Sequence, residues 1–193
     1  MNLKSLALAL SLAASPLALA QNAYAADYSV DAGHSAVNFK LSYANVSTFW
    51  GRFNKFEGRF HFDANNLAKS KVEISIEADS VFTADKKRDD HLRSPDFFSA
   101  KQFPKITFTS TSVKAGSKAG TFIASGNLTM RGVTKPVTVE LVKTGEGKDG
   151  YGKERIGFEA TFTINRLDYG VSFAPDGLGK DVTVIVSISG VKS

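Results

Sequence analysis

Alternation of apolar and polar residues over residues 51–62 constrains the fold more than any other feature of the sequence. One parity carries Phe56, Gly58, Phe60 and Phe62, and the positions between them carry Glu57, Arg59 and His61. Successive side chains of an extended chain point to opposite sides, so this pattern predicts a half-buried β-strand. Three phenylalanines on one face of a single strand indicate one wall of a strongly apolar interior.

The same two-residue period recurs along the chain and predicts about eight antiparallel strands. Apolar phases are set by Val37, Phe39, Leu41 and Tyr43; Val72, Ile74, Ile76 and Ala78; Ile106 and Phe108; Phe122, Ala124, Gly126, Leu128 and Met130; Val137, Val139 and Leu141; Ile156, Phe158, Ala160, Phe162 and Ile164; and Val182, Val184, Val186 and Ile188. Eight strands can close into a barrel with room for one small ligand, and closure removes exposed edges. A two-sheet sandwich would show the same alternation, so periodicity leaves both architectures open.

The first 25 residues have the pattern of a secretory signal peptide. Lys4 lies in a short polar start, residues 6–19 are an apolar run, and Ala23-Tyr24-Ala25 offers small residues for cleavage. A transmembrane helix fits less well, because Ser11, Ser15 and Pro16 interrupt a run that is shorter than the ~20 apolar residues a bilayer needs. We therefore expect an exported protein whose mature chain, residues 26–193, forms one domain.

Composition excludes several classes of function. Cysteine is absent, which rules out disulfides, thiol catalysis and thiolate metal sites. Without Lys4, 23 Lys and Arg remain against 19 Asp and Glu, a net charge of +4 that is scattered along the chain. Such a distribution is more typical of a soluble surface than of a nucleic-acid interface.

Residues 85–103 depart from the two-residue period and predict a single short helix at one end of the sheet. Ser94 can cap a helix whose first residue is Pro95, and Pro104 limits its length. Phe97 and Phe98 would pack from this helix onto an apolar surface.

Candidate chemistry is sparse. His34, His61 and His91 are far apart in the sequence and show no local metal-ligand spacing, so we expect no metal. A nucleophile elbow, a phosphate-binding loop and a dinucleotide fingerprint are all absent. The densest charged cluster is Arg88, Asp89, Asp90, His91 and Arg93. It could bind a ligand headgroup at a cavity mouth, or hold the loop and helix against the sheet through salt bridges, which is the commoner role of such runs.

The inward-facing phenylalanines also allow two interpretations. Phe39, Phe56, Phe60, Phe62, Phe108, Phe122, Phe158 and Phe162 project to one side, interleaved with small residues such as Ala124 and Ala160. Large and small residues together can fill a core like a jigsaw or can line a channel, and the residues alone do not decide.

Five segments, in order and over essentially the whole mature chain, resemble the YceI family of bacterial periplasmic proteins. They are H-S-A-V-N-F-K (residues 34–40), R-D-D-H-L-R-S-P-D-F-F (88–98), F-P-K-I-T-F-T-S (103–110), G-N-L-T-M-R-G-V-T-K-P-V-T (126–138) and N-R-L-D-Y-G (165–170). The resemblance implies an all-β fold, a lipocalin-like antiparallel barrel of eight strands with one short helix capping an end, that encloses a polyisoprenoid or isoprenoid quinone. It supplies no catalytic residues. Tyr43 stands where relatives often have a histidine, and tyrosine can still donate a hydrogen bond there.

We therefore predict a non-enzymatic carrier that buries an isoprenoid tail in the barrel, with no cofactor. The predicted lumen residues are Phe39, Leu41, Phe56, Phe60, Phe62, Ile74, Ile76, Phe108, Phe122, Phe158, Phe162 and Val184, and the predicted headgroup contacts are Tyr43, Arg88, His91 and Arg93. An enzyme or redox-linked partner acting on a bound quinone is the alternative, with His91, Asp90 or Tyr43 as proton donor. A structural module with a filled core is a third. Nucleic acid is not an expected partner, whereas transient membrane contact and a homodimer remain open.

Overall fold

A computed structural model describes residues 25–193 as a β-structure with one α-helix. The strands are β1 (Ala26–Val30), β2 (Ala36–Tyr43), β3 (Ser47–Phe53), β4 (Phe56–Phe62), β5 (Lys71–Glu77), β6 (Val81–Phe82), β7 (Lys105–Ala115), β8 (Thr121–Met130), β9 (Val133–Lys148), β10 (Glu154–Asn165) and β11 (Asp181–Lys192). The helix is α1 (Lys86–Arg93), and the short 3₁₀ turns are η1 (Ala32–His34), η2 (Leu67–Lys69), η3 (Ala78–Ser80) and η4 (Arg166–Tyr169). The expected signal peptide falls on residues 1–24, outside the described residues.

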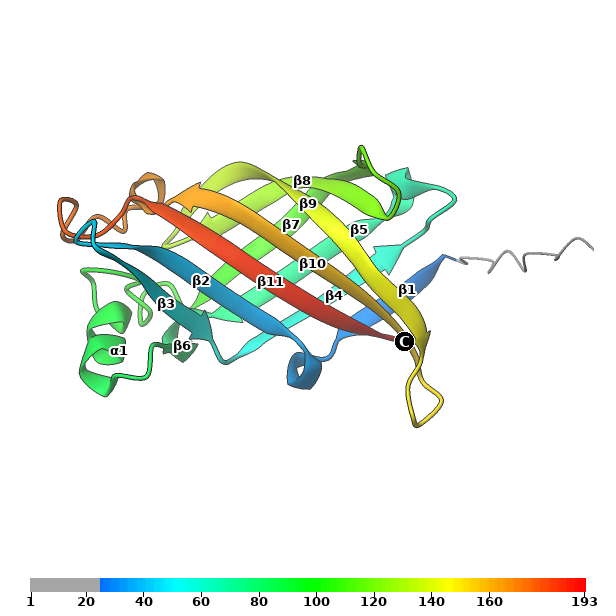
Figure 1. The fold of residues 1–193 in the computed structure, drawn as a ribbon, viewed down its shortest axis with the longest axis horizontal. Coiled ribbons are helices and arrows are strands. Elements are labelled where there is room, and N and C mark those ends of the chain that lie inside the picture. Colours follow the sequence, from blue (N-terminus) through cyan, green and yellow to red (C-terminus); the bar gives the residue numbers. More distant parts are fainter. Residues whose placement is uncertain (1–24) are drawn as a thin grey trace, which may run out of the picture.

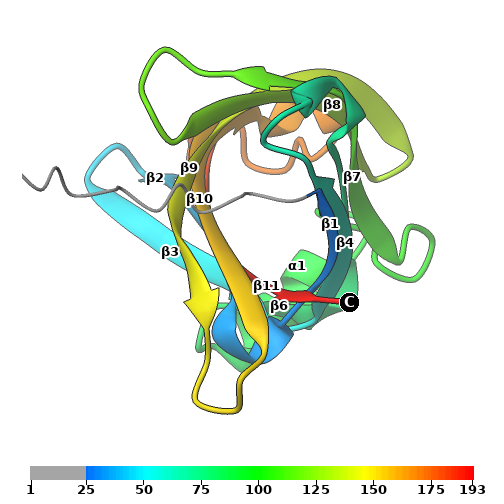
Figure 2. The same ribbon diagram turned by 90° about the vertical axis from the view of Figure 1, so that its right-hand side faces the viewer.

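These strands form one antiparallel sheet that closes into a barrel, so the barrel prediction is confirmed and the sandwich is excluded. The hydrogen-bonded order is β1-β4-β5-β7-β8-β9-β10-β11-β2-β3-β6, and an additional β1–β11 pairing closes the ring. In Figure 1 the long strands run obliquely from one end to the other, and Figure 2 looks along the barrel with α1 at the far end.

Three of the eight strand positions are built from two short strands each. β1 and β2 both pair with β11, while β4 pairs with β1 and β3 pairs with β2, so these four strands fill two positions. β5 and β6 pair with β4 and β3 and fill a third. The stretch 51–62, predicted as one strand, is therefore broken at Asn54-Lys55. Because of this break, the odd-numbered residues up to Phe53 face the barrel interior in β3, whereas the even-numbered residues from Phe56 onward face it in β4.

The helix prediction was wrong in its position. α1 covers Lys86–Arg93, and Asp85 is its N-cap, accepting a hydrogen bond of 2.9 Å from the Arg88 N–H. Ser94 lies at the C-terminal end of the helix instead, where its N–H donates to the His91 carbonyl oxygen. An N-cap aspartate satisfies helix-end donors as well as a serine does, and the Lys and Arg residues after it favour helix, so the helix forms over the charged run.

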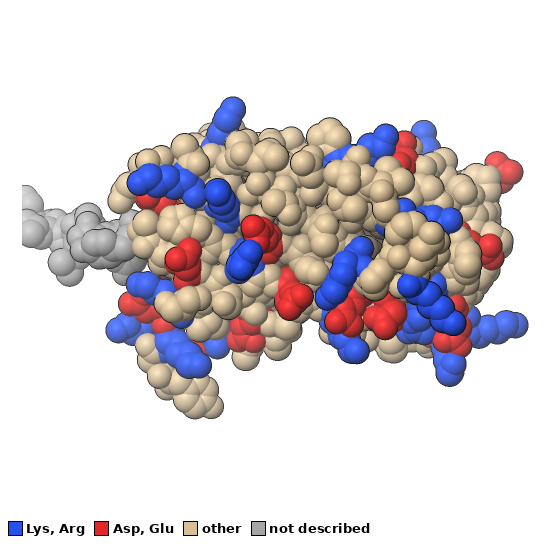
Figure 3. Space-filling model, turned by 180° about the vertical axis from the view of Figure 1, so that it is seen from behind, with Lys and Arg blue, Asp and Glu red and all other residues tan. Residues whose placement is uncertain are grey.

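Charges are mixed over the face drawn in Figure 3, where Lys and Arg alternate with Asp and Glu. Among residues 25–193, no helix is long and apolar enough to cross a membrane. Apolar side chains gather inside the barrel in two clusters. The larger lies toward α1 and includes Phe39, Phe53 and Phe97; the smaller lies at the other end around Phe60 and Phe158.

Candidate functional site: an apolar cavity in the barrel

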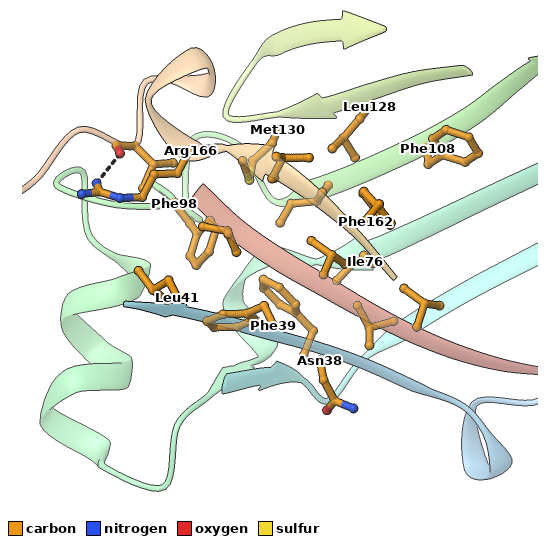
Figure 4. A pocket seen from close by; sticks show the side chains of 18 of the residues that line it. Asn38, Phe39, Leu41, Ile76, Phe98, Phe108, Leu128, Met130, Phe162 and Arg166 are labelled. Carbon is orange, nitrogen blue, oxygen red and sulfur yellow. Dashed lines mark hydrogen bonds between the residues drawn. The ribbon is translucent and has the colours of Figure 1, made fainter. Parts of the chain in front are cut away.

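A cavity of about 900 Å³ runs inside the barrel, which makes the interior more than a filled core. This volume is near the upper end of the 300–1,000 Å³ typical of small-molecule sites. Its wall is almost entirely aliphatic and aromatic, and no Asp or Glu of the described residues lines it. Figure 4 shows side chains from many strands, including Phe39, Ile76 and Phe162, along this space, while Asn38 points away from them.

The structure places nine of the twelve predicted lumen residues on the cavity wall: Phe39, Leu41, Phe60, Ile74, Ile76, Phe108, Phe158, Phe162 and Val184. The other three do not line it. Phe62 and Phe122 belong to the smaller aromatic cluster beyond the inner end of the cavity, and Phe56 packs against the larger cluster. Alternation predicts the face of a strand on which a side chain lies, but not its depth along the barrel. Contact of these residues with a ligand stays a prediction.

Several residues of the cavity wall at the α1 end were not predicted from the sequence. They are Phe49 and Phe53 of β3, and Val171, Phe173 and Leu178 of the segment between η4 and β11. Phe49, Gly51 and Phe53 share one face of β3, and this alternation is visible in the sequence. It was overlooked because the inward face of residues 51–62 was assigned from Phe56, Phe60 and Phe62, which lie after the break at Asn54-Lys55.

The cavity opens at the α1 end. Its exposed wall residues are Tyr43, Ser47, Thr48, Arg88, His91, Phe173 and Gly177. They come from the β2–β3 turn region, α1 and the η4–β11 segment, which lie together at one end of the barrel in Figure 1. Most polar groups of the wall are at this opening, so the site suits an amphiphile with a long apolar part and a polar end.

Arg88 lies at the opening and is held by Thr83. Its Nε donates to the Thr83 hydroxyl oxygen at 2.8 Å and its Nη2 to the Thr83 carbonyl oxygen at 2.6 Å. The guanidinium also lies 4.8 Å from the ring centroid of Phe49. Asp89 is buried and accepts hydrogen bonds from the Thr83 N–H and hydroxyl. This half of the charged cluster therefore anchors the helix while leaving Arg88 on the cavity wall.

His91 lies at the opening, whereas Arg93 does not line the cavity. His91 pairs with Asp96 at 2.9 Å, and its ring makes edge contacts with Phe97 and Phe173. Arg93 donates to the carbonyl oxygens of Asp79 and Val81 and to Asp90. The predicted headgroup role of Arg93 therefore has no support in its position, and the structural interpretation of the cluster describes this residue better.

Arg166, the second residue of the N-R-L-D-Y-G motif, is buried at the open end and was not predicted. All its N–H groups point at carbonyl oxygens, those of Val171, Phe173, Ala174, Leu178 and Gly179. Burial lowers the pKa of its guanidinium from the ordinary value. The planar fork of an arginine suits this task. One side chain thus shapes the segment that forms one side of the cavity opening.

The three histidines lie in separate places, each beside one aspartate. His34 pairs with Asp31, His61 with Asp27 and His91 with Asp96. Within residues 25–193, no group of three or more His, Cys, Asp or Glu side chains could hold a metal ion.

A closed eight-stranded barrel with an apolar cavity open at one end defines a lipocalin-like class of protein. Comparison with known families matches residues 28–190 to the YceI-like domain. The chain belongs to this family. Protein YceI of Salmonella newport is 40% identical over 173 residues, covering 89% of this chain and 90% of that protein. A UPF0312 protein of Yersinia enterocolitica is 40% identical over 176 residues, covering 90% and 91%.

Solved structures show the same fold. BcnA of Burkholderia cenocepacia superposes with a TM-score of 0.76 at 23% identity, covering 83% of this chain and 98% of that one. The YceI protein of Campylobacter jejuni gives 0.69 at 29% identity, covering 77% and 87%. A domain described as polyisoprenoid binding, from Saccharophagus degradans and implicated in plant cell wall breakdown, gives 0.66 at 18% identity, covering 86% and 98%.

Proposed function

We propose that this protein is a periplasmic carrier that buries the tail of one long isoprenoid lipid, a polyisoprenoid or an isoprenoid quinone, in the barrel cavity. The observation that carries the proposal is the apolar wall of a cavity of about 900 Å³ that no Asp or Glu of residues 25–193 lines. Each buried CH₂ contributes about 0.8 kcal/mol, so a long tail can bind tightly even after its ordering cost. The polyisoprenoid binding described for a similarly folded domain supports this ligand class.

The polar end of the lipid would lie at the opening, near Tyr43, Arg88 and His91. Tyr43 is 54% exposed and lies where β2 ends, so its hydroxyl can meet both water and a ligand. The Arg88 Nε and Nη2 groups are committed to Thr83, which leaves Nη1 to face a headgroup. These groups suit hydroxyl, carbonyl or phosphate oxygens.

Exposed apolar side chains at and near the open end support brief contact with a membrane, from which such a lipid must come. Tyr43 and Phe173 line the opening, and Val46 lies in the turn beside it. Trp50 and Phe82 are exposed on β3 and β6, further along the outside of the barrel. Lys40 lies over the Trp50 ring and Arg52 over the Phe82 ring, so each of these two aromatic rings has a basic side chain beside it. Aromatic and basic groups together suit the lipid–water interface.

Export to the periplasm is part of the same proposal. The segment before Ala26 has the pattern of a signal peptide. Ala26 is the first residue of β1 and pairs with Phe62 of β4. Cleavage after Ala25 would therefore leave β1 complete.

The proposal is tested by placing one phenylalanine inside the cavity and one outside. Ala160 lies on the cavity wall and is buried, whereas its neighbour Thr161 is exposed on the outer face of β10. On delipidated protein we expect Ala160→Phe to lower uptake of a polyprenol, with little change in melting temperature, because the ring enters open space. Thr161→Phe, the matched control, should take up lipid as the unmodified protein does. Loss of about 1–3 kcal/mol of stability in Ala160→Phe with uptake intact would instead indicate a packed core.

One contact favours the alternative, an enzyme or redox-linked partner acting on a bound quinone. The His91–Asp96 pair lies at the opening and could donate a proton to a bound carbonyl group. A carrier returns its extracted quinone chemically unchanged after prolonged incubation. An enzyme would deplete the quinone, and His91→Gln would abolish that depletion.

A further inference from the structure

Four phenylalanine rings close the barrel at the end opposite α1. They are Phe60, Phe62, Phe122 and Phe158, named here the closed-end cluster. Phe158 makes edge contacts with Phe60, Phe62 and Phe122 at ring-centroid distances of 5.9, 5.4 and 6.1 Å. Phe62 and Phe122 also meet edge to face at 5.1 Å. Such mutual contacts fix each ring against its neighbours.

The Phe60 ring extends sideways over the neighbouring strands instead of lying along its own strand. Phe60 belongs to β4 and stacks on Tyr28 of β1, with 5.1 Å between ring centroids and 13° between ring planes. Beyond β1, its far edge lies against Gly190 of β11, where an added Cβ would collide with it. Only glycine at this position leaves room for the ring. Phe60 therefore spans three adjacent strands.

The cavity reaches two members of this cluster and stops there. Phe60 and Phe158 line the cavity, whereas Phe62 and Phe122 do not and lie behind them. Both lining rings are buried, with 7% and 8% of their surface exposed. At its inner end the cavity therefore meets these two rings, with Val72, Leu141 and Ile188 on the wall beside them and two further rings behind.

We propose that Phe60 and Phe158 determine the greatest tail length that the cavity accepts. This inference rests on the proposed lipid-binding function. Each added methylene that enters the cavity should strengthen binding about fourfold. Once the tail touches these two rings, further units must remain at the open end in water and add nothing. Affinity should therefore rise with tail length to a breakpoint and then level off.

The test measures binding of polyprenols of increasing isoprene number to delipidated protein. The unmodified protein should show one breakpoint. Phe158→Leu and Phe60→Leu should move it to longer tails by at least one isoprene unit, because each removes part of the inner wall. Gly190→Ala should move it to shorter tails, since the new methyl group displaces the Phe60 ring. Phe108→Leu is the matched control: Phe108 lines the side wall, so affinity should change without a shift of the breakpoint.

Melting curves identify the variants that fold. If only one of the two leucine variants folds, that variant alone is enough to test the proposal. A breakpoint unchanged in a folded leucine variant, or shifted equally by Phe108→Leu, would overturn the proposal. Absence of binding by the unmodified protein at every length would instead refute the proposed function, so the two failures are distinguishable.

Discussion

Arg166 donates a hydrogen bond of 2.6 Å to the carbonyl oxygen of Val171, five residues ahead of it in the chain. Four further carbonyl oxygens of residues 173–179 surround the same guanidinium. The segment between η4 and β11 is neither helix nor strand, but its backbone makes a turn, in which the Gly177 and Leu178 N–H groups donate to the Ala174 carbonyl oxygen, and Leu178 forms a bridge with Tyr43. The buried arginine adds five hydrogen bonds to these and so helps to hold one side of the cavity opening in place.

Arg166→Ala should lower the free energy of unfolding by about 2–4 kcal/mol, because it leaves several carbonyl groups without donors. The free energy of unfolding of Arg166→Lys should lie between those of Arg166→Ala and the unmodified protein, since an ammonium group keeps the charge but not the planar set of donors. Arg59→Ala is the control: its exposed ion pair with Glu73 should contribute less than about 1 kcal/mol. Urea unfolding measures all three. Equal midpoints for Arg166→Ala and the unmodified protein would contradict this account.

Acid should weaken the closed end of the barrel through Asp31. The Arg155 guanidinium, 2.6 Å away, and His34 lower the pKa of this carboxyl from 3.8 to about 2. A carboxyl whose pKa is lowered by folding stabilises the protein above its unfolded pKa, and this contribution is lost as pH falls through the folded value. Asp31→Asn should therefore melt below the unmodified protein at pH 5 and above, and the difference should shrink below pH 4 and vanish only when the pH is below the folded pKa of about 2.

The control for this pH series is Glu159→Gln, an exposed position on β10. Its melting temperature should follow that of the unmodified protein from pH 2 to pH 7. A constant difference between Asp31→Asn and the unmodified protein over the whole range would mean that the ion pair with Arg155 does not carry the effect.

Transfer of lipid to and from vesicles should depend on the rim of the opening. Val46, 82% exposed in the β2–β3 turn, is the most exposed apolar residue of that end. Val46→Asp should slow polyprenol transfer severalfold without changing equilibrium affinity, because a carboxylate disfavours contact with a bilayer. Tyr151→Ser, at the opposite end of the barrel, should leave the rate unchanged. Equal rates for both variants would exclude the open end as the membrane contact.

The sequence predicted the barrel and much of its wall because a strand with one buried face must alternate. Phe158, Ala160 and Phe162 follow this rule and all lie on the cavity wall. The rule failed where a strand is interrupted, since each break resets the parity. Phe49 and Phe53 were missed for this reason. Phe62 and Phe122 have the predicted orientation but lie too deep, and depth depends on barrel closure, which local pattern does not encode.

Polar anchors were the least predictable part of the site. Arg88, Arg93 and Arg166 carry the same charge and all lie near the open end, yet only two of them line the cavity. Their positions depend on which backbone carbonyl groups are left unpaired by tertiary folding. The helix was predicted in the wrong place for a related reason. Asp85 and Ser94 are both good N-cap residues, and the helix-favouring residues between them determine that it begins after Asp85.

Export predicts a defined N-terminus. N-terminal sequencing of protein from the periplasmic fraction should begin at Ala26, because small residues precede that position and β1 begins there. Ala25→Leu, which removes the small residue before the cleavage site, should accumulate uncleaved chain. A periplasmic chain that retains Met1 would contradict the signal-peptide assignment.

Native mass spectrometry of protein purified gently from its own periplasm would show whether the barrel carries a lipid. We expect a chain of residues 26–193 with one molecule of a long-chain isoprenoid lipid bound at near equimolar ratio. This lipid should be released intact on activation and recovered in an organic extract, because an empty cavity of about 900 Å³ lined by apolar side chains is poorly hydrated. A spectrum of the bare chain, together with no uptake of added polyprenol or isoprenoid quinone, would contradict this expectation.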